Sequence, residues 1–245
     1  DFNEQFCSGH HSATMTSVKL LGVDDVLCEA HVKYGPALKK AEAAFNEALD
    51  VFGDEDFETK KGWKKEGGSP EHDIVYSKQI SNGKLFALKG EIPGDSHTVF
   101  YDNWKDFEEI SKWNSNYVFT KKVVELSEHA DIIHYGNGDM LIVKGRDFVC
   151  IRIHRKYGDG FLLAACSVEL TDIPETKSHV RGNLHIGAGR FMPKESDPNA
   201  TVVDYILCAD LNGFIPKTIV NQVMARMMLN DLASTKKHIL SLKQK

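Results

Sequence analysis

The sequence contains no apolar segment long enough to cross a membrane and no excess of positive charge. No part of its 245 residues forms an apolar run of about 18 side chains, the length that a membrane-spanning helix requires. The formal net charge is −5, whereas proteins that bind nucleic acid usually present a strongly basic face. We therefore expect neither an integral membrane protein nor a protein that binds nucleic acid.

The sequence also lacks the short motifs of several enzyme classes and metal sites. It has no GxGxxG or GxxxxGK[ST] for nucleotides, no GxSxG for hydrolases, and neither CxxC nor HExxH for zinc. The N-terminus shows no secretion signal, and the five cysteines are odd in number and scattered, as is typical of reduced thiols in a cytosolic protein. They are Cys7, Cys28, Cys150, Cys166 and Cys208. We accordingly expect no metal, no cofactor and no enzymatic activity.

Two segments show the spacing of amphipathic helices. Residues 36–52 repeat small and apolar side chains at helical spacing, with a proline in the first turn and a glycine just after the end. Residues 216–243 carry a second apolar stripe that is rich in methionine, and a helix of this length would be roughly 40 Å long. Two short helices are expected within residues 95–113, and residues 18–34 are compatible with one more.

The middle of the chain alternates apolar and polar side chains, which is the pattern of β-strands. Asn82-Gly83 and Tyr157-Gly158-Asp159-Gly160 are tight-turn signals between such runs and predict antiparallel hairpins. The expected strands are residues 63–66, 73–79, 84–91, 118–126, 131–135, 139–143, 147–156, 161–170, 180–186, 189–193 and 201–210. An amphipathic helix laid over such a sheet buries its stripe against the concave side, where a curved sheet has room for a cavity. We therefore predict an α+β fold in which a curved antiparallel sheet wraps around the long C-terminal helix.

One charged residue, Arg152, lies in the middle of an otherwise apolar strand. Side chains alternate along a strand, so Phe148, Cys150 and Arg152 share one face. A guanidinium keeps its proton, and burying one without a partner costs several kcal/mol. Two interpretations stay open: Arg152 faces water, or it points into an internal space that supplies a partner.

The cysteines and histidines of the predicted strands have both a catalytic and a structural interpretation. Cys150 or Cys166 could act with His154 or His134 as a nucleophilic pair. A cysteine in an apolar strand is more often inert, because burial raises the pKa of its thiol. We therefore favour packing over catalysis for these cysteines.

Three methionines of the last helix, Met224, Met227 and Met228, also have two interpretations. They either fill the core or line a space whose occupant comes and goes, since thioether side chains are flexible. A helix rich in methionine and leucine suits the wall of a lipid pocket, which is mostly apolar with few polar groups.

Four short motifs occur in an order and spacing that match a known family. Arg146-Asp147-Phe148-Val149 is followed by Arg152, and residues 210–222 read DLNGFIPKTIVNQ. Lys112-Trp113-Asn114 and Val180-Arg181-Gly182 are the two others. Together they resemble START domains, the steroidogenic acute regulatory protein-related lipid-transfer family, and the resemblance is closest to the sterol-binding branch.

The resemblance implies a helix-grip fold, in which a U-shaped antiparallel sheet grips the C-terminal helix around an internal tunnel for one lipid. It covers about residues 35–243, so we expect a lipid-binding START domain over residues 35–245 and an N-terminal extension over residues 1–34. The loop at residues 136–145 and the helix at residues 216–243 would open to release the lipid.

The function implied by the resemblance is the binding of one lipid and its transfer between membranes, without catalysis. In the sterol-binding branch the ligand is a sterol or, in an insect relative, a carotenoid, whereas other branches carry phosphatidylcholine or ceramide. A module in which the bound lipid regulates a protein partner is the alternative. The implied protein is a cytoplasmic monomer that contacts membrane surfaces transiently.

The resemblance also assigns residues to the ligand site. It makes Arg152 the anchor for a ligand hydroxyl and places Asn114 and Ile110 in the pocket. The predicted ligand-binding residues are Arg152, Asn114, Ile110, Trp113, His134, Tyr135, Asp139, Cys150, Met224, Met227 and Met228.

This sequence departs from the family pattern at the partner of the arginine. The family has a carboxylate on the preceding strand, in a pattern like ISYD. Here Ile132-Ile133-His134-Tyr135 is followed by Gly136, so that acid is missing. Asp139, or the polar atoms of His134 and Tyr135, are the candidates for its role.

Overall fold

A single large sheet forms the centre of the molecule in a computed structural model that describes residues 16–68 and 73–243. Its strands are β3 (Lys64–Gly67), β4 (Val75–Ile80), β5 (Gly83–Ile92), β6 (Tyr117–Ser127), β7 (Ala130–Asn137), β8 (Arg146–Tyr157), β9 (Gly160–Ser167), β10 (Val180–Arg181), β11 (Asn183–Lys194) and β12 (Asp197–Asp210). They follow the order β3-β4-β5-β12-β11-β9-β8-β7-β6, and neighbours in this series are antiparallel. The short β10 pairs with β8 in parallel.

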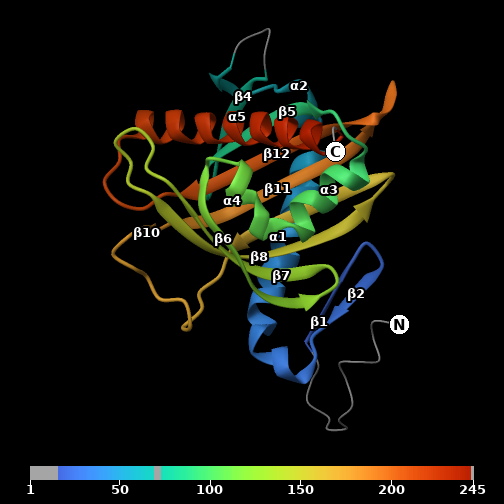
Figure 1. The fold of residues 1–245 in the computed structure, drawn as a ribbon, viewed down its shortest axis with the longest axis vertical. Coiled ribbons are helices and arrows are strands. Elements are labelled where there is room, and N and C mark those ends of the chain that lie inside the picture. The colour runs from blue at the N-terminus through green and yellow to red at the C-terminus, as the bar shows by residue number, and fades with distance from the viewer. Residues whose placement is uncertain (1–15, 69–72, 244–245) are drawn as a thin grey trace.

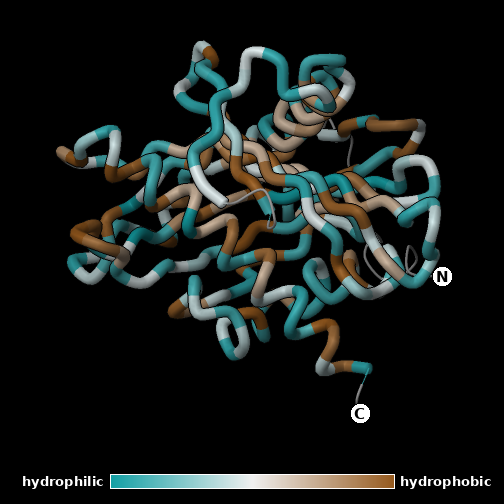
Figure 2. The backbone as a smooth tube through the Cα atoms, turned by 90° about the horizontal axis from the view of Figure 1, so that it is seen from above, coloured by the Kyte–Doolittle hydropathy of each residue, from teal (hydrophilic) through white to brown (hydrophobic). Residues whose placement is uncertain are grey.

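Helices cover both faces of this sheet (Figure 1). α5 (Lys217–Leu242) lies along one face, and α1 (Gly35–Gly53) packs on the other. Because side chains alternate along each strand, Val149 of β8 packs on the side of α1, whereas Phe148 packs on the side of α5. Figure 2 shows hydrophobic stretches along the strands through the middle of the molecule, and further hydrophobic stretches at some of the outer loops. The predicted α+β helix-grip fold is confirmed.

Short helices connect the strands. They are η1 (Glu29–Tyr34), α2 (Glu55–Thr59), α3 (Ser96–Lys105), η2 (Phe107–Glu109) and α4 (Ile110–Trp113). α3 begins where the side chain of Asp95 accepts a hydrogen bond from the backbone N–H of Thr98 at 2.9 Å, an ordinary N-terminal cap. The two short helices expected within residues 95–113 are therefore confirmed, whereas α2 is too short to show a periodicity and was not predicted.

The first described residues form a β-hairpin, and the short helix suggested for residues 18–34 is wrong over most of its length. The strands β1 (Ser17–Leu20) and β2 (Val23–Val26) are joined by Leu21 and Gly22 at φ of 50° and 83°. Two residues with positive φ are what a tight hairpin turn of this length requires. Strands of four residues are too short to show alternation, and only η1 retains a helical turn.

A buried ion pair holds this hairpin against the sheet. Arg155 of β8 and Asp25 of β2 each have a side chain that is 1% exposed, and Arg155 Nη2 donates to Asp25 Oδ2. Arg155 Nε also donates to the carbonyl of Leu20 at 3.0 Å, and Asp25 accepts from the hydroxyl of Ser127 at 2.5 Å. The N-terminal extension is thus packed on the domain from β1 onward, while residues 1–15 lie outside the described residues.

Two strand predictions need correction around the hairpin of β8 and β9. Residues 139–143 form no strand; they belong to the loop between β7 and β8, where Met140 and Val143 make only an isolated bridge. Residues 180–186 and 189–193 do not form two strands, because β10 ends at Arg181 and β11 runs without a break from Asn183 to Lys194. The register of β11 against β12 continues without a shift from Ile186 to Pro193, across the predicted gap at residues 187–188.

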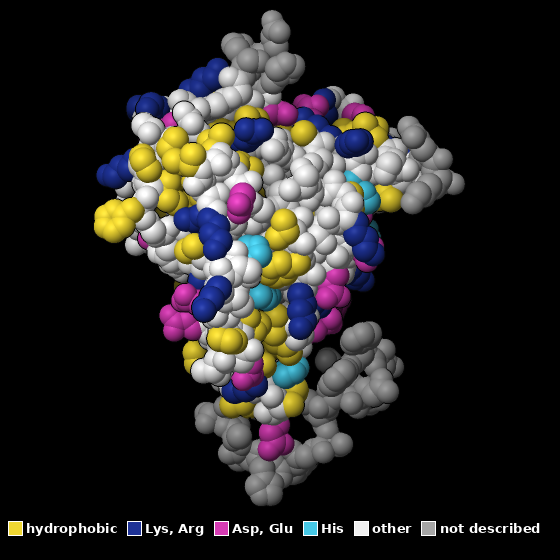
Figure 3. All heavy atoms as spheres, turned by 60° about the vertical axis from the view of Figure 1, so that its left-hand side comes forward, with side chains coloured by type: hydrophobic (Ala, Val, Ile, Leu, Met, Phe, Trp, Pro, Cys, Tyr) yellow, Lys and Arg dark blue, Asp and Glu magenta, His cyan; other side chains and the backbone are white. Residues whose placement is uncertain are grey.

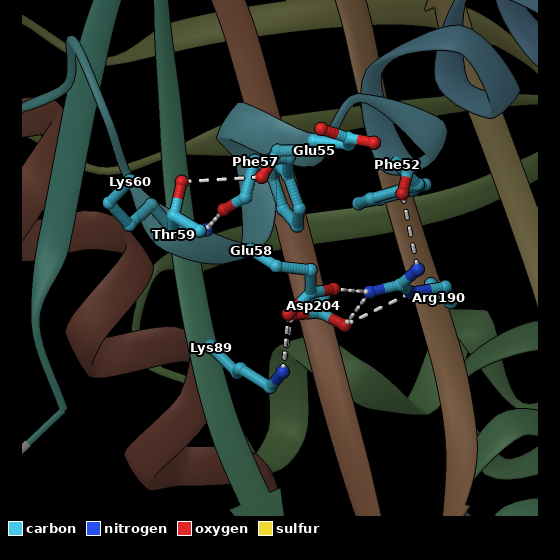
Figure 4. Close-up of polar contacts among 9 residues, drawn as sticks. All are labelled: Phe52, Glu55, Phe57, Glu58, Thr59, Lys60, Lys89, Arg190 and Asp204. Atoms are coloured by element: carbon cyan, nitrogen blue, oxygen red, sulfur yellow. Dashed lines mark hydrogen bonds and ion pairs between the residues drawn. The ribbon is translucent and has the colours of Figure 1, made fainter.

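A network of charged side chains fixes α2 to the sheet (Figure 4). Glu58 of α2 accepts from Arg190 of β11 at 2.5 Å and from Lys89 of β5 at 2.9 Å. Arg190 also donates through Nε and Nη2 to Asp204 Oδ2 of β12, at 3.0 and 2.7 Å. Partial burial would raise the pKa of Glu58, but the hydrogen bonds from Lys89 and Arg190 outweigh it and lower that pKa.

Replacing Glu58 by glutamine is expected to lower the free energy of unfolding by about 0.5–1 kcal/mol near neutral pH, the range of half-exposed ion pairs. A carboxylate with a lowered pKa stabilises the fold above its unfolded pKa and loses this effect as the pH falls through its folded pKa. The difference between wild type and variant should therefore shrink in acid. Urea unfolding at pH 7 and in acid measures it, and Glu55→Gln is the control because Glu55 makes no ion pair among the described residues. Equal losses for both variants would contradict a role for the network.

Candidate functional site

A cavity of about 220 Å³ lies between the sheet and α5. Its wall is mostly apolar and comes from β6, β7, β8, β9, β11, β12, the segments beside them and α5. The lining residues are Asn116, Tyr117, Tyr135, Asn137, Phe148, Leu163, Ala165, Leu184, Gly187, Ala188, Gly189, Phe191, Tyr205, Ile206, Leu207, Ala209, Leu211, Met224, Met227, Met228 and Asp231.

The space exists because neighbouring strands present small residues to it. Ala165 of β9 is opposite Gly187 of β11 in the register, and both line the cavity. α5 closes the space with Met224, Met227, Met228 and Asp231. The spacing of these four residues places them on one face of the helix. Strands with small residues and a helix with long flexible ones thus form the two walls.

Amide side chains tie α5 to the strands at the polar end of the cavity. Asn114 Nδ2 donates to Asp231 Oδ1 at 2.5 Å, and Asn114 Oδ1 accepts from the backbone N–H of Asn116 at 3.1 Å. Asn116 Nδ2 donates to the carbonyl of Met227 at 2.8 Å. Asn137 Nδ2 donates to the carbonyl of Asn116 at 2.8 Å. The helix, the segment after α4 and the end of β7 are therefore joined by one chain of hydrogen bonds.

Asp231 is a carboxyl group at the edge of an apolar space. Burial raises its pKa to about 6, and hydrogen bonds from Asn114 and Asn116 offset part of this effect. Burial also raises the pKa of Tyr117 and Tyr205, and the nearby charge of Asp231 adds to the increase in both cases. The two hydroxyls therefore stay protonated within the electrostatic reach of Asp231.

Replacing Asp231 by asparagine is expected to stabilise the fold near neutral pH and to have little effect in acid. The raised pKa means that the ionised carboxylate is penalised in the folded state above about pH 6, and that the penalty disappears as the pH falls towards 3.8, the ordinary pKa of an aspartate. A shift of this size corresponds to roughly 2–3 kcal/mol. Urea unfolding of both proteins between pH 4 and pH 8 measures the difference.

The control for this prediction is Asp73→Asn. It removes the same charge from a residue that pairs with Lys236 of α5 at 2.7 Å but does not line the cavity. This variant should show no gain in stability at pH 8. A wild type as stable as Asp231→Asn at pH 8 would contradict a penalty for burying the carboxylate.

The structure pairs Arg152 with Asp131, which lies directly opposite it on β7. Arg152 is 4% exposed, and its Nε and Nη2 donate to the two carboxylate oxygens of Asp131 at 2.8 and 2.6 Å. Nη2 also donates to the carbonyl of Trp104 at 3.1 Å, and the guanidinium carbon lies 4.4 and 4.5 Å from the ring centres of Trp104 and Phe107. Arg152 therefore does not face water, and it is not among the residues that line the cavity.

The sequence pattern did not identify Asp131 as this partner. Asp139, one candidate, accepts a hydrogen bond from the backbone N–H of Gly145 at 2.6 Å within the loop between β7 and β8. His134, another, lies 2.8 Å from Asp147 Oδ2. The register of β7 against β8 places Asp131 opposite Arg152. The alternation of apolar and polar residues does not determine this register, because the register also depends on how many residues form the loop between β7 and β8.

The predicted ligand-binding residues are divided between the cavity wall and its surroundings. Tyr135 and the three methionines of α5 line the cavity, and Asn114 is one hydrogen bond away from it through Asp231. Trp113 stacks on His238 with ring centres 4.2 Å apart, outside the wall. The other predicted residues that do not line it are Ile110, His134, Asp139, Cys150 and Arg152.

Several polar residues of the wall were not predicted. They are Asn116, Tyr117, Asn137, Tyr205 and Asp231. A signal was present for Asp231, which follows Met224 and Met227 at the helical spacing of the apolar stripe. The others lie at strand ends or among aromatic residues, where the sequence does not show which face is hollow.

The buried cysteines are poorly suited to nucleophilic catalysis. Burial raises the pKa of Cys150 to about 12 and that of Cys166 to about 11. Burial lowers the pKa of His154 to about 3, so this imidazole stays neutral. Among the described residues no hydrogen bond joins either cysteine to a histidine, so the structure offers no activated thiol at these positions.

Exposed apolar side chains gather where two loops meet beside the N-terminal end of α5. Leu141 is 52% exposed, Ile142 is 78% exposed and Phe214 is fully exposed; we call these three the apolar tip. The loops lie side by side in Figure 1, and Arg146 joins them by donating to the carbonyl of Leu211 at 2.9 Å. Figure 3 shows hydrophobic side chains on this side of the molecule, bordered by Lys and Arg.

Within residues 16–68 and 73–243, every helix is too short or too polar to serve as a membrane-spanning segment.

Comparison with known proteins places this chain among relatives with the same architecture. The model of the START domain matches residues 44–245. Steroidogenic acute regulatory-like protein 1 of Caenorhabditis elegans is 37% identical over 233 residues, which cover 95% of this chain and 90% of that protein. The steroidogenic acute regulatory protein of Xenopus laevis is 29% identical over 196 residues, which cover 79% and 67%.

Solved structures show the same fold at lower sequence identity. Human StAR-related lipid transfer protein 5 matches with a TM-score of 0.76 and 21% identity, over 86% of this chain and 99% of that one. The match to the START model extends over most of the described structure, from the middle of α1 to the end of α5. The chain therefore belongs to the START domain family.

Proposed function

We propose that this protein binds one hydrophobic lipid, with a sterol as the first candidate and a carotenoid as the second, and carries it between membranes. The observation that supports this is the mostly apolar cavity beneath α5 in a chain of the START family. The names of its relatives, a steroidogenic acute regulatory-like protein and a lipid transfer protein, point in the same direction. The proposal is one of binding and transport, not of catalysis.

Most of the affinity for such a ligand would come from burying its apolar surface, at about 25 cal/mol per Å² before the cost of association is subtracted. The cavity of about 220 Å³ is smaller than the roughly 300–1,000 Å³ of typical ligand pockets. A sterol-sized ligand therefore requires Met224, Met227 and Met228 to change rotamer and α5 to shift outward. Flexible thioether side chains permit this adjustment at low cost.

Entry and release require an opening, and our proposal is that it forms beside the apolar tip. Leu141, Ile142 and Phe214 flank the N-terminal end of α5, and Lys and Arg side chains border the hydrophobic side chains on this side of the molecule (Figure 3). Exposed apolar groups within a basic border suit transient insertion into the surface of a membrane with anionic lipids. The protein would then act at the cytoplasmic surface of membranes, as a monomer.

The experiment that tests the proposal uses the fluorescent sterol dehydroergosterol. We expect saturable binding with one sterol per chain and transfer of the sterol between donor and acceptor liposomes. Organic extraction of the native protein followed by mass and absorption spectra identifies the natural ligand, including a carotenoid, a phospholipid or a ceramide. Binding without any transfer would favour a lipid-gated interaction module instead, and absence of all lipid binding would overturn the proposal.

Replacing Ile142 by serine is expected to slow sterol transfer about tenfold, since burial of one large apolar side chain contributes roughly 1.5–3 kcal/mol to membrane binding. Equilibrium binding of dehydroergosterol should not change, because Ile142 does not line the cavity. Val118→Ser, which alters a side chain that is 54% exposed outside the tip, serves as the control. Equal transfer rates for the wild type and the Ile142 variant would contradict a membrane role for the tip.

A further inference from the structure

The cavity wall carries charge of one sign only. Among the lining residues in the described part of the chain there is one carboxylate, Asp231, and no Lys, Arg or His. The nearby guanidinium of Arg152 is held by both oxygens of Asp131 and by the carbonyl of Trp104. A ligand head group in this cavity therefore meets a negative potential that no cation in the wall offsets. In a poorly hydrated space such a potential strongly disfavours a second anion.

A second acceptor in the wall has no partner. Asn137 is 6% exposed and lines the cavity, and its Oδ1 makes no hydrogen bond to any described residue. Its orientation is fixed, because Nδ2 donates to the carbonyl of Asn116 at 2.8 Å and would lose this bond if the amide were flipped. A buried acceptor without a donor is costly to the fold. A ligand that brings a donor hydrogen would remove this cost.

The acceptors of Asp231 and Asn137 belong to the same end of the cavity. Each is one hydrogen bond away from the segment between Asn114 and Asn116. Tyr117 follows this segment and pairs with Asn137 in the sheet register. Its hydroxyl makes no hydrogen bond to any described residue, so it can donate to a ligand oxygen.

We propose, building on the lipid-binding function above, that this polar end selects a neutral lipid bearing a hydroxyl group. The hydroxyl donates to Asp231 or Asn137 and accepts from a tyrosine. Lipids with an ionised acid head group are excluded. A hydroxyl can donate to these acceptors and also accept from Tyr117, whereas an ammonium can only donate. In this assignment the acceptors beneath α5, rather than Arg152, set the orientation of the ligand.

The test compares matched lipids as competitors of dehydroergosterol on the full chain. Cholesterol should displace it at concentrations about tenfold lower than cholesterol 3-methyl ether, which keeps the oxygen but lacks the donor. Octadecan-1-ol should compete, whereas octadecanoate at pH 8 should not compete at a hundredfold excess. Octadecylamine, whose head group is an ammonium, is compared with octadecan-1-ol, whose head group is a hydroxyl. Weaker competition by the amine than by the alcohol supports the hydroxyl assignment, and stronger competition contradicts it.

Variants of the carboxylate provide the second arm. Asp231→Asn should allow octadecanoate to compete, and the double variant Asp231→Leu/Asn137→Leu, which removes both acceptors, should remove the preference for cholesterol over its methyl ether. Asp73→Asn removes the same charge away from the cavity and should change neither result. Equal competition by cholesterol and its ether in the wild type, or exclusion of octadecanoate by the Asp231→Asn variant, would overturn this inference alone. Failure of every lipid to bind would overturn it together with the proposed function.

Discussion

Replacing Asp131 by leucine is expected to lower the free energy of unfolding by about 3–5 kcal/mol, because the change leaves a buried charge without its partner. Arg152 is 4% exposed and loses both of the charge-assisted hydrogen bonds that Asp131 accepts. Its remaining contacts, the carbonyls of Asn103 and Trp104 and two aromatic rings, do not neutralise a guanidinium. Urea unfolding followed by circular dichroism measures the loss, and a stability within 1 kcal/mol of wild type, about a fivefold change in the unfolding equilibrium, would contradict it.

The double variant Asp131→Leu/Arg152→Leu is the matched control for this prediction. Removing both charges leaves an apolar pair, which in other proteins is close to neutral or even stabilising. We therefore expect the double variant to recover most of the stability that the single variant loses, which a double-mutant cycle quantifies. The same double variant also tests the role of Arg152. If it binds dehydroergosterol as tightly as wild type, Arg152 is not the anchor of the ligand.

The largest functional effect is expected from filling the cavity at Ala165. A phenylalanine there projects into the space opposite Gly187, where no side chain occupies the facing strand position. We expect Ala165→Phe to reduce sterol affinity at least about a hundredfold, since the ring takes the place that the ligand requires. The fold should persist with a change of at most roughly 1–3 kcal/mol, because the ring occupies existing space. Titration with dehydroergosterol and urea unfolding measure the two quantities.

Ala233→Phe is the control for the filled cavity. It introduces the same ring on α5 at an exposed position that does not line the cavity. Sterol affinity should stay close to that of the wild type in this variant. Tight sterol binding by Ala165→Phe would mean that the ligand binds somewhere other than the cavity beneath α5.

The features that could be predicted from the sequence are those with a local signal. The hairpin of β8 and β9 is marked by Tyr157-Gly158-Asp159-Gly160 between two apolar runs, and α5 by a long apolar stripe. The apolar face of β8 that carries Arg152 could also be deduced, since alternation assigns it. The formation of these elements is determined by residues that are close together in the sequence, and the structure confirms the elements.

The features that could not be predicted depend on how distant segments align. Asp131 becomes the partner of Arg152 only through the register of β7 against β8, and Asp25 becomes the partner of Arg155 only when the N-terminal hairpin docks. The polar end of the cavity is another case. Asn116, Asn137 and Asp231 come from three separate segments, and only Asp231 carries a sequence signal, its place in the apolar stripe of α5.

The ion pair between Arg155 and Asp25 has a practical consequence for making this protein in the laboratory. The match to the START model begins at residue 44, and a gene trimmed to that boundary would omit Asp25 together with both strands of the hairpin. The guanidinium of Arg155, whose side chain is 1% exposed in the full chain, would then lose its only carboxylate among the described residues. Expression plasmids should therefore start upstream of β1, because the shorter product would bury this charge without a partner and lose stability.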